Sequence, residues 1–137
     1  MAEHTSFRFD WNEVEGAQIA AILGLDAMTL SDGSAQWDAV AICIGETAVM
    51  VTVEPDTDQV IISREVPPCG EGWQSIASFD FAVGKTLGWS WIGINSQGYK
   101  DALTVAFGPG PDSIWPRCTF VAAASSLTVF DLVARSA

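Results

Sequence analysis

The sequence predicts a mainly β fold, of the β or α+β class, with about eight antiparallel strands in a sandwich or a small barrel and at most one or two short helices. Three observations support this. Many short segments alternate between apolar and polar side chains, as pleated strands do. Clusters of Gly, Pro, Asn, Asp and Ser separate these segments. The chain has 137 residues, 49% of them hydrophobic, so residues 1–137 are expected to form a single domain with its own core.

The first 25 residues give one weak strand and one ambiguous segment. Residues 1–11 form a polar lead-in, in which alternating aromatic side chains favour a short strand. Residues 12–25 have two interpretations. Asn12 followed by Glu15 fits a capping box ahead of a helical apolar stripe, whereas the sequence GAQIAAILGL also reads as a strand. An internal repeat, described below, favours the strand.

The next segment predicts a three-stranded antiparallel meander. Residues 31–34 (SDGS) form a turn. Strands with alternating side chains follow, and they are expected at residues 37–44, 48–54 and 60–66. Tight turns at residues 45–47 and 55–58 connect them.

A connection rich in Pro and Gly then separates the meander from the second half. Residues 67–72 (PPCGEG) cannot lie within a central strand or a helix, so they are expected on the surface. Residues 73–83 remain ambiguous, because Trp73 and Ile76 fit a helical turn whereas Phe79 and Phe81 alternate as in a strand.

Two hairpins are expected in the second half. The first covers residues 88–107, and its strands meet at the turn Asn95–Gly98. A loop is expected at residues 108–112. The second hairpin joins residues 117–123 to residues 127–133 around a Ser-Ser turn.

The two halves of the chain show an internal similarity. The segment DAVAICIG at residues 38–45 aligns with DALTVAFG at residues 101–108, and each leads to two further strands. One interpretation is a duplicated four-strand unit, with halves at residues 12–66 and 73–134. The other is that buried strands in general share small and branched residues.

Charge is concentrated in the first half. The formal net charge is −11. Residues 1–68 hold twelve acidic and two basic residues, whereas residues 69–137 hold five and four. This argues against nucleic-acid binding through a basic face and is suited to a basic protein partner. The alternative is that the acidic half only maintains solubility.

The expected location is cytoplasmic. No apolar run reaches the roughly 20 residues that span a bilayer, and the first residues lack the basic and apolar regions of a secretion signal. No membrane association is expected. Cys43, Cys69 and Cys118 are widely spaced, so a disulfide framework is not expected. A zinc site is not expected either, because His4 is the only histidine.

Few residues have the pattern of a catalytic or metal site, and we expect no catalytic residue, metal or cofactor. Gly84-Lys85-Thr86 resembles the end of a phosphate-binding loop but lacks its first glycine. Cys69 would need a base to act as a nucleophile. The acidic side chains around the turn at residues 54–58 lack the calcium-loop pattern and favour an ordinary turn.

The tryptophan-rich hairpin supplies the candidate ligand-binding residues. If its tryptophans line a cavity, the polar groups beside them would give it specificity; otherwise the tryptophans fill the core and the polar groups stabilise the turn. The candidates are Trp89, Trp91, Asn95, Gln97, Tyr99 and Asp101.

This hairpin also carries a family resemblance. The residues concerned are Gly84, Lys85, Trp89, Trp91, Asn95, Gln97, Gly98, Tyr99 and Asp101. Their spacing resembles a signature of small bacterial proteins grouped as a domain of unknown function, over about residues 38–133 and most sharply over residues 84–107. The resemblance implies a compact bacterial single-domain protein and supplies no catalytic residue.

These observations favour a small acidic protein without catalytic activity, which acts through protein–protein contact as an immunity- or adaptor-like protein. The alternative is a β-barrel that binds a small ligand in a tryptophan-lined pocket. An enzyme using Cys69, Lys85 or Asp101 is the third hypothesis. A homodimer is compatible with each of them.

Overall fold

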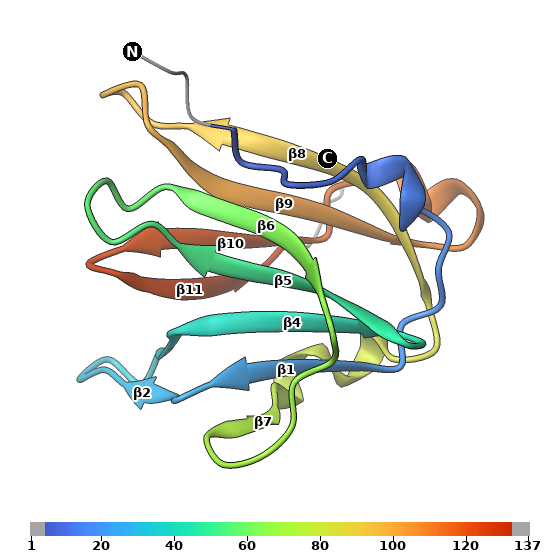
Figure 1. The fold of residues 1–137 in the computed structure, drawn as a ribbon, viewed down its shortest axis with the longest axis horizontal. Helices are drawn as coiled ribbons and strands as arrows, with labels where there is room; N and C mark the ends of the chain where they lie inside the picture. Colours follow the sequence, from blue (N-terminus) through green and yellow to red (C-terminus); the bar gives the residue numbers. More distant parts are fainter. Residues whose placement is uncertain (1–4, 133–137) are drawn as a thin grey trace, which may run out of the picture.

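A computed structural model, in which residues 5–132 are described, shows two antiparallel β-sheets with short 3-10 helices between strands (Figure 1). Sheet A has the strand order β6-β5-β4-β1-β7, and sheet B has the order β2-β3-β11-β10-β9-β8. The mainly β prediction is therefore confirmed, with eleven strands. Across residues 5–132 the sheets do not close into a barrel, so the sandwich is the correct alternative and the barrel is wrong.

The strands of sheet A come mostly from the first half of the chain. They are β1 (Ala21–Leu25), β4 (Ala39–Ile44), β5 (Thr47–Val53), β6 (Val60–Glu65) and β7 (Trp73–Ser75). The predicted meander corresponds to β4, β5 and β6, which pair in that order.

The strands of sheet B come mostly from the second half. They are β2 (Met28–Thr29), β3 (Ala35–Trp37), β8 (Thr86–Ile94), β9 (Lys100–Gly108), β10 (Cys118–Ala123) and β11 (Ser126–Asp131). Both predicted hairpins are present, as β8–β9 and β10–β11. The three 3-10 helices are η1 (Trp11–Glu13), η2 (Ala77–Ala82) and η3 (Gly110–Ile114).

Each sheet contains a four-strand unit with the same chain order. Strands β1, β4, β5 and β6 lie side by side in sheet A, and β8, β9, β10 and β11 do so in sheet B. The aligned segments at residues 38–45 and 101–108 contain or overlap the second strand of each unit. Each half also contributes a short piece to the other sheet, since β7 pairs with β1 and β3 pairs with β11. The duplication itself stays a prediction.

The two segments that were ambiguous between helix and strand each combine a strand with 3-10 helical residues. Within residues 12–25, only Ala21–Leu25 form a strand, and a 3-10 helix precedes it with Asp10 as its cap. Residues 73–83 combine the strand β7 with the 3-10 helix η2. The segment before residue 37, where only a turn was predicted, also holds the short strands β2 and β3.

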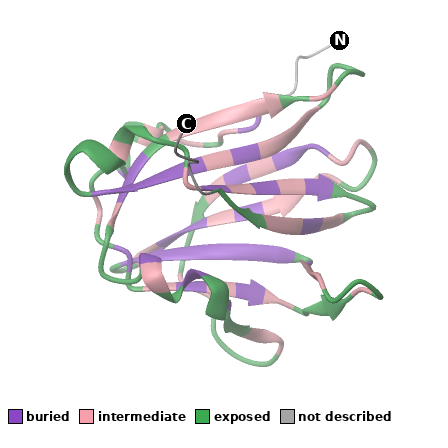
Figure 2. Ribbon diagram, turned by 180° about the vertical axis from the view of Figure 1, so that it is seen from behind, coloured by how far each residue is buried: buried purple, intermediate pink, exposed green. Residues whose placement is uncertain are grey.

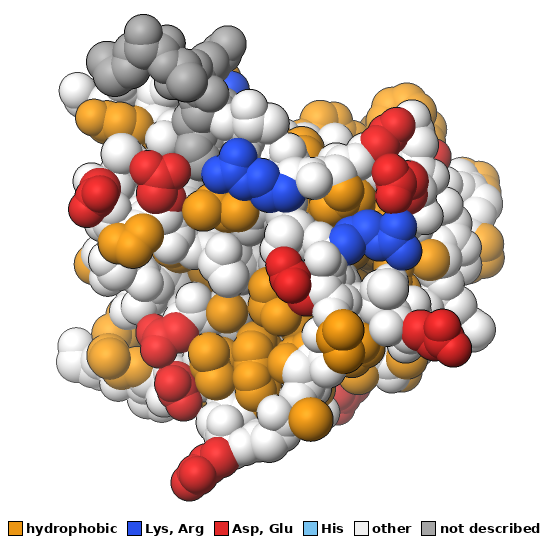
Figure 3. Space-filling view, viewed as in Figure 1, with side chains coloured by type: hydrophobic (Ala, Val, Ile, Leu, Met, Phe, Trp, Pro, Cys, Tyr) orange, Lys and Arg blue, Asp and Glu red, His pale blue; other side chains and the backbone are white. Residues whose placement is uncertain are grey.

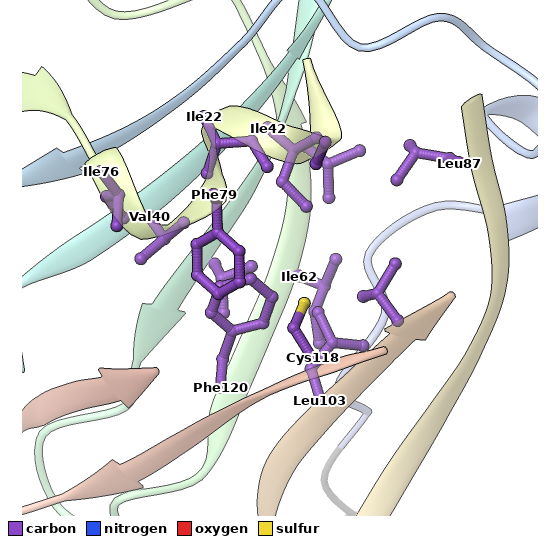
Figure 4. Close-up of a cluster of buried hydrophobic side chains, with 14 of the residues drawn as sticks. Ile22, Val40, Ile42, Ile62, Ile76, Phe79, Leu87, Leu103, Cys118 and Phe120 are labelled. Carbon is purple, nitrogen blue, oxygen red and sulfur yellow. The ribbon is translucent and has the colours of Figure 1, made fainter. Parts of the chain in front are cut away.

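The core lies between the two sheets, and a 3-10 helix covers one end of it. Figure 4 shows Ile42 and Ile62 of sheet A opposite Leu103 and Phe120 of sheet B. Phe79 of η2 lies against Phe120, with 6.1 Å between ring centroids. Seen from behind, sheet B alternates between buried and partly exposed positions (Figure 2). Its inner face is therefore apolar core, and its outer face is open.

The outer edge of sheet A is covered by the N-terminal segment. The Arg8 amide donates to the Ile62 carbonyl, and the Ile62 amide donates to the Ser6 carbonyl, each at 2.8 Å. The predicted short strand within residues 1–11 is reduced to an isolated bridge between Phe7 and Ile62 among the residues described. This segment satisfies backbone groups that would otherwise form a free sheet edge.

Candidate functional site

The outer face of sheet A is apolar, although the solvent side of an antiparallel sheet is usually polar. The pairing register places Leu23, Ala41 and Met50 in one row across β1, β4 and β5. We call the outward positions of this sheet the A face. They are Ala21, Leu23, Leu25, Ala39, Ala41, Cys43, Ala48, Met50, Thr52, Ile61, Ser63, Glu65, Trp73 and Ser75.

Small residues at the centre of the A face allow larger neighbours to cover them. Ala41 and Ala48 have no exposed surface although they point away from the sandwich interior. Leu23, Met50 and Trp73 pack over this cluster and remain partly exposed. The sheet therefore carries a second hydrophobic cluster outside the core, and its top is open to a partner.

Carboxylates surround this apolar cluster. Among the paired positions of the A face, all within the described residues, Glu65 alone is charged, and it lies on the outermost strand β6. Glu46 in the β4–β5 turn and Glu71 before β7 are exposed. Figure 3 shows hydrophobic side chains gathered over β1, β4 and β5, with separate acidic groups around them. Such an arrangement favours a partner with apolar and basic side chains.

The sequence contained a signal for this surface that simple alternation does not capture. In β4 all six residues are buried, because both alternating sets are apolar. A strand that is apolar on both sides reads as continuous hydrophobic sequence. The pattern AVAICI therefore marks a strand covered on both faces.

The candidate tryptophans lie on the opposite sheet. Trp89 and Trp91 contact each other on β8, with ring centroids 6.3 Å apart. Trp89 is 50% exposed and lines a cavity of about 380 Å³ together with Pro109 and Ser113. The two rings lie outside the hydrophobic cluster that fills the space between the sheets.

The candidate polar residues near the tryptophans bond with one another around the β8–β9 turn. The Asn95 Oδ1 atom accepts from the Gln97 amide at 2.9 Å and from the Tyr99 amide at 3.2 Å. The Asn95 Nδ2 atom donates to Asp101 Oδ2 at 3.1 Å. These bonds hold the turn and engage the side chains of Asn95 and Asp101, whereas Gln97 and Tyr99 take part through their backbone amides.

The carboxylates around the β5–β6 turn also have a structural contact. Asp58 has a positive φ of 54°, and its Oδ1 atom accepts from the Ser125 amide in the β10–β11 turn at 2.8 Å. Within residues 5–132 no group of three or more acidic, cysteine or histidine side chains is placed to hold a metal ion.

A larger cavity lies at the end of the sandwich near η2 and η3. Its volume is about 520 Å³, and its walls combine aromatic and charged side chains: Phe81, Lys85, Phe107, Asp112, Trp115, Pro116, Arg117 and Leu132. The Arg117 guanidinium lies 4.1 Å from the centroid of the Phe81 ring and forms an ion pair with Asp131. Lys85 is exposed just before β8 and contributes to this lining.

Comparison with known proteins identifies one family. Its description, "Family of unknown function (DUF6334)", matches residues 1–136. The chain belongs to the DUF6334 family. The predicted resemblance to a domain of unknown function is thereby confirmed. No curated protein and no solved structure matches the chain significantly.

The three cysteines of this DUF6334 protein lie in different environments. Cys118 is in the core, where burial raises the pKa of its thiol to about 12 against a smaller lowering by Arg117. Cys43 lies in the cluster on the A face, and burial also raises its pKa. Cys69 is exposed in the loop before β7. None of the three forms a disulfide.

The residues considered for catalysis in the DUF6334 chain are not gathered in one cavity. Lys85 lines the cavity near η2, whereas Cys69 and Asp101 are not part of its lining. His4 lies outside the described residues. The same described part of the chain has no helix that is long and apolar enough to cross a bilayer.

Proposed function

We propose that this protein is a non-catalytic binding module whose A face receives a protein partner with apolar and basic side chains. The observation that carries the proposal is the second hydrophobic cluster on the outer side of sheet A, with Leu23, Met50 and Trp73 at its top. The upper surface of this cluster still contacts water in the monomer. A partner that covers it would remove this apolar surface from water and so stabilise the complex.

The charge distribution defines the partner more closely. Acidic residues are exposed at several points around the A face, among them Glu46, Glu65 and Glu71. Basic side chains of a partner would approach these carboxylates while its apolar side chains cover Met50 and Leu23. Long-range attraction of this kind raises association rates and becomes weaker as salt screens the charges.

The test uses the tagged protein expressed in its own host cells and recovered gently at low salt. Native mass spectrometry of the wild type should show a basic polypeptide bound to it. Met50→Asp should abolish recovery of that polypeptide, because it places a charge on the apolar cluster. Glu65→Lys should weaken recovery, and raising salt should weaken the wild-type complex.

A matched control separates this surface from general acidity. Val83→Asp adds the same charge at a residue that is 47% exposed, lies after η2 and is not one of the A-face positions. It should leave recovery unchanged. The proposal is wrong if Met50→Asp and Val83→Asp recover the partner equally, or if the bound polypeptide is acidic and insensitive to salt.

The cavity near η2 and η3 supports a second candidate function, the binding of a small aromatic anion. Trp115 is 63% exposed and would cover an aromatic ring, while Lys85 and Arg117 would attract a carboxylate or phosphate. Asp112 lines the same cavity and would accept a hydrogen bond from the ligand. A volume of about 520 Å³ lies in the usual range for small-molecule sites.

This second candidate is tested by NMR titration with phenyl phosphate, benzoate and neutral benzyl alcohol. The two anions should shift the Trp115 indole signal, and Lys85→Gln should weaken the effect. Lys100→Gln removes a base outside this lining and serves as the control. Equal shifts with benzyl alcohol, or no shift with any of the three, would exclude a site for aromatic anions.

A further inference from the structure

The outer face of sheet B carries no charged side chain at its regularly paired positions, whereas Lys100 and Asp101 lie at the irregular end of β9 next to the β8–β9 turn. Inward positions such as Leu103 and Phe120 belong to the core, so the alternate positions point outward. We call these outward positions the B face. They are Met28, Gln36, Trp91, Gly93, Ala102, Thr104, Thr119, Val121, Ala123, Ser126, Thr128 and Phe130. None of these described positions carries an acid or a base, in a chain with seventeen acidic residues.

Several polar side chains on the B face bond with each other. The hydroxyls of Thr104 and Thr119 are 2.8 Å apart on neighbouring strands. The Gln36 Nε2 atom donates to Thr128 Oγ1 at 3.4 Å. Covering a polar group is costly when it loses its hydrogen bond to water without replacement. Because these groups already have partners, the face can be covered at a smaller cost.

Large apolar side chains on and beside the B face remain exposed to solvent. Met28 is 58% exposed, Trp89 is 50% exposed and Phe130 is 49% exposed. One register row crosses four strands: Trp91 pairs with Thr104, Thr104 pairs with Thr119, and Thr119 pairs with Phe130. An aromatic residue therefore lies at each end of this row, and exposed apolar surface of this extent is typical of an interaction site.

We propose that the B face is the interface between two copies of this chain in a symmetric dimer. In a two-fold dimer the same patch is present on both copies, and residue i of one copy contacts residue j of the other. A patch with acidic groups and no basic ones would therefore bring like charges together. With a net charge of −11, two copies repel each other wherever acidic groups meet. The B face has no acidic position, and its uncharged threonine, tryptophan and phenylalanine side chains are compatible with themselves.

The same argument separates the two faces of the sandwich. The A face includes Glu65 and has exposed carboxylates around it, so a second copy placed there would meet like charge. A basic partner is suited to the A face, whereas a second acidic copy is suited to the B face. This inference does not depend on the function proposed for the A face.

The size of the B face fits a modest dimer. Six strands spaced roughly 4.8 Å apart, with an average length of about 20 Å, cover an area on the order of 600 Å². Stable complexes bury about 800 Å² on each partner, and weaker ones bury less. The dimer is therefore best sought over a wide concentration range, from dilute to roughly millimolar protein.

Analytical ultracentrifugation of the whole chain tests this proposal. We expect a monomer–dimer equilibrium that is unchanged or strengthened at roughly 0.5 M salt, because salt screens the repulsion between acidic copies. This is opposite to the salt response expected at the A face, so failure of one proposal is distinguishable from failure of the other. Phe130→Asp should weaken the dimer by at least about tenfold, a free-energy change of about 1.4 kcal/mol.

Val83→Asp is the matched control, since Val83 is 47% exposed and lies off the B face. It should leave the dimer constant unchanged, and thermal melting should show that both variants fold. A dilution series of the wild type followed by methyl NMR gives a second readout that needs no variant. Methyl signals of Val121 and Thr119 should shift with concentration, whereas those of Val66 should not.

Three results would overturn the proposal. The first is a monomer at every concentration and salt. The second is a dimer that Phe130→Asp leaves intact. The third is a dilution series in which the concentration-dependent signals come from the A face.

Discussion

The indole ring of Trp37 covers Gly24 so closely that no side chain fits between them. A Cβ atom on Gly24 would lie 2.3 Å from Trp37 Cε3. Gly24 belongs to β1 of sheet A, whereas Trp37 ends β3 of sheet B and is 6% exposed. This contact joins the two sheets where the chain crosses from one to the other.

The Gly24→Ala variant should therefore be less stable. The added methyl group would displace a buried indole ring, and overpacking of this kind typically costs about 1–3 kcal/mol. For a chain of this size the melting temperature should fall by roughly 3–10 °C. Gly93→Ala is the control and should lower the melting temperature less, because its Cβ would lie 3.1 Å from the Ala102 methyl group. Equal melting temperatures for the two variants would contradict the packing described here.

Both the backbone conformation of Asp58 and the hydrogen bond of its side chain should stabilise the fold. Its backbone has a positive φ of 54°, which Asn and Asp tolerate better than Ala, and its carboxylate binds the Ser125 amide. Asp58→Ala should lower the free energy of unfolding by about 1–2 kcal/mol. Asp58→Asn keeps an acceptor and the backbone preference, so it should cost less in urea denaturation. A larger loss in the Asn variant would refute this assignment.

The Asn95 side chain should stabilise the β8–β9 turn. Its side chain accepts from two backbone amides and donates to Asp101, so Asn95→Ala should cost about 1–2 kcal/mol in denaturant unfolding. Gln97→Ala removes a neighbouring exposed side chain and should cost less than about 0.5 kcal/mol. If Asn95→Ala instead left stability unchanged and reduced binding of a ligand, the side chain would have a recognition role.

Thiol labelling should distinguish the three cysteines. Cys69 is exposed, whereas Cys43 and Cys118 are buried with raised pKa values. In the native protein at about pH 8, one thiol per chain should react rapidly, since the thiolate is the reactive form. Cys69→Ser should remove the rapid phase and Cys43→Ser should not. Rapid labelling of two thiols in the native protein would contradict the burial of the A-face cluster.

Cys118 should make the fold less stable in alkaline solution. Folding raises its pKa from about 9 to about 12, so the native state keeps this proton in a range where the unfolded state has lost it. The free energy of unfolding therefore falls as pH rises from about 9 to 12. Cys118→Ala should lower stability at neutral pH by leaving a small cavity but should flatten this alkaline slope. Identical slopes in calorimetric melts would contradict the assignment.

The strand pattern was predictable where polar turns separate alternating residues. The meander β4–β5–β6 and both hairpins were predicted because side-chain period and turn chemistry agree there. The short strands β2, β3 and β7 were missed, since two or three residues hold too little local pattern. They exist because they pair with β11 and β1, which are distant in sequence.

The candidate surfaces were less predictable than the strands. The sequence drew attention to Trp89 and Trp91, yet it could not show which face of the sheet they occupy. No sequence pattern indicated that Met50 and Leu23 share an outer surface, because strand register decides which residues lie side by side. That Lys85 and Arg117 line the same cavity likewise depends on contacts between distant segments.

By itself, the sequence determined that this protein is mainly β, strongly acidic in its first half and able to form a core. These properties are local, since they depend on composition, period and turn residues. Only the tertiary structure decided that the sheets form an open sandwich and that each half of the chain contributes short strands to the sheet formed mostly by the other half. It also decided which apolar residues face outward, because pairing register and the packing of one sheet on the other are long-range properties that no local pattern encodes.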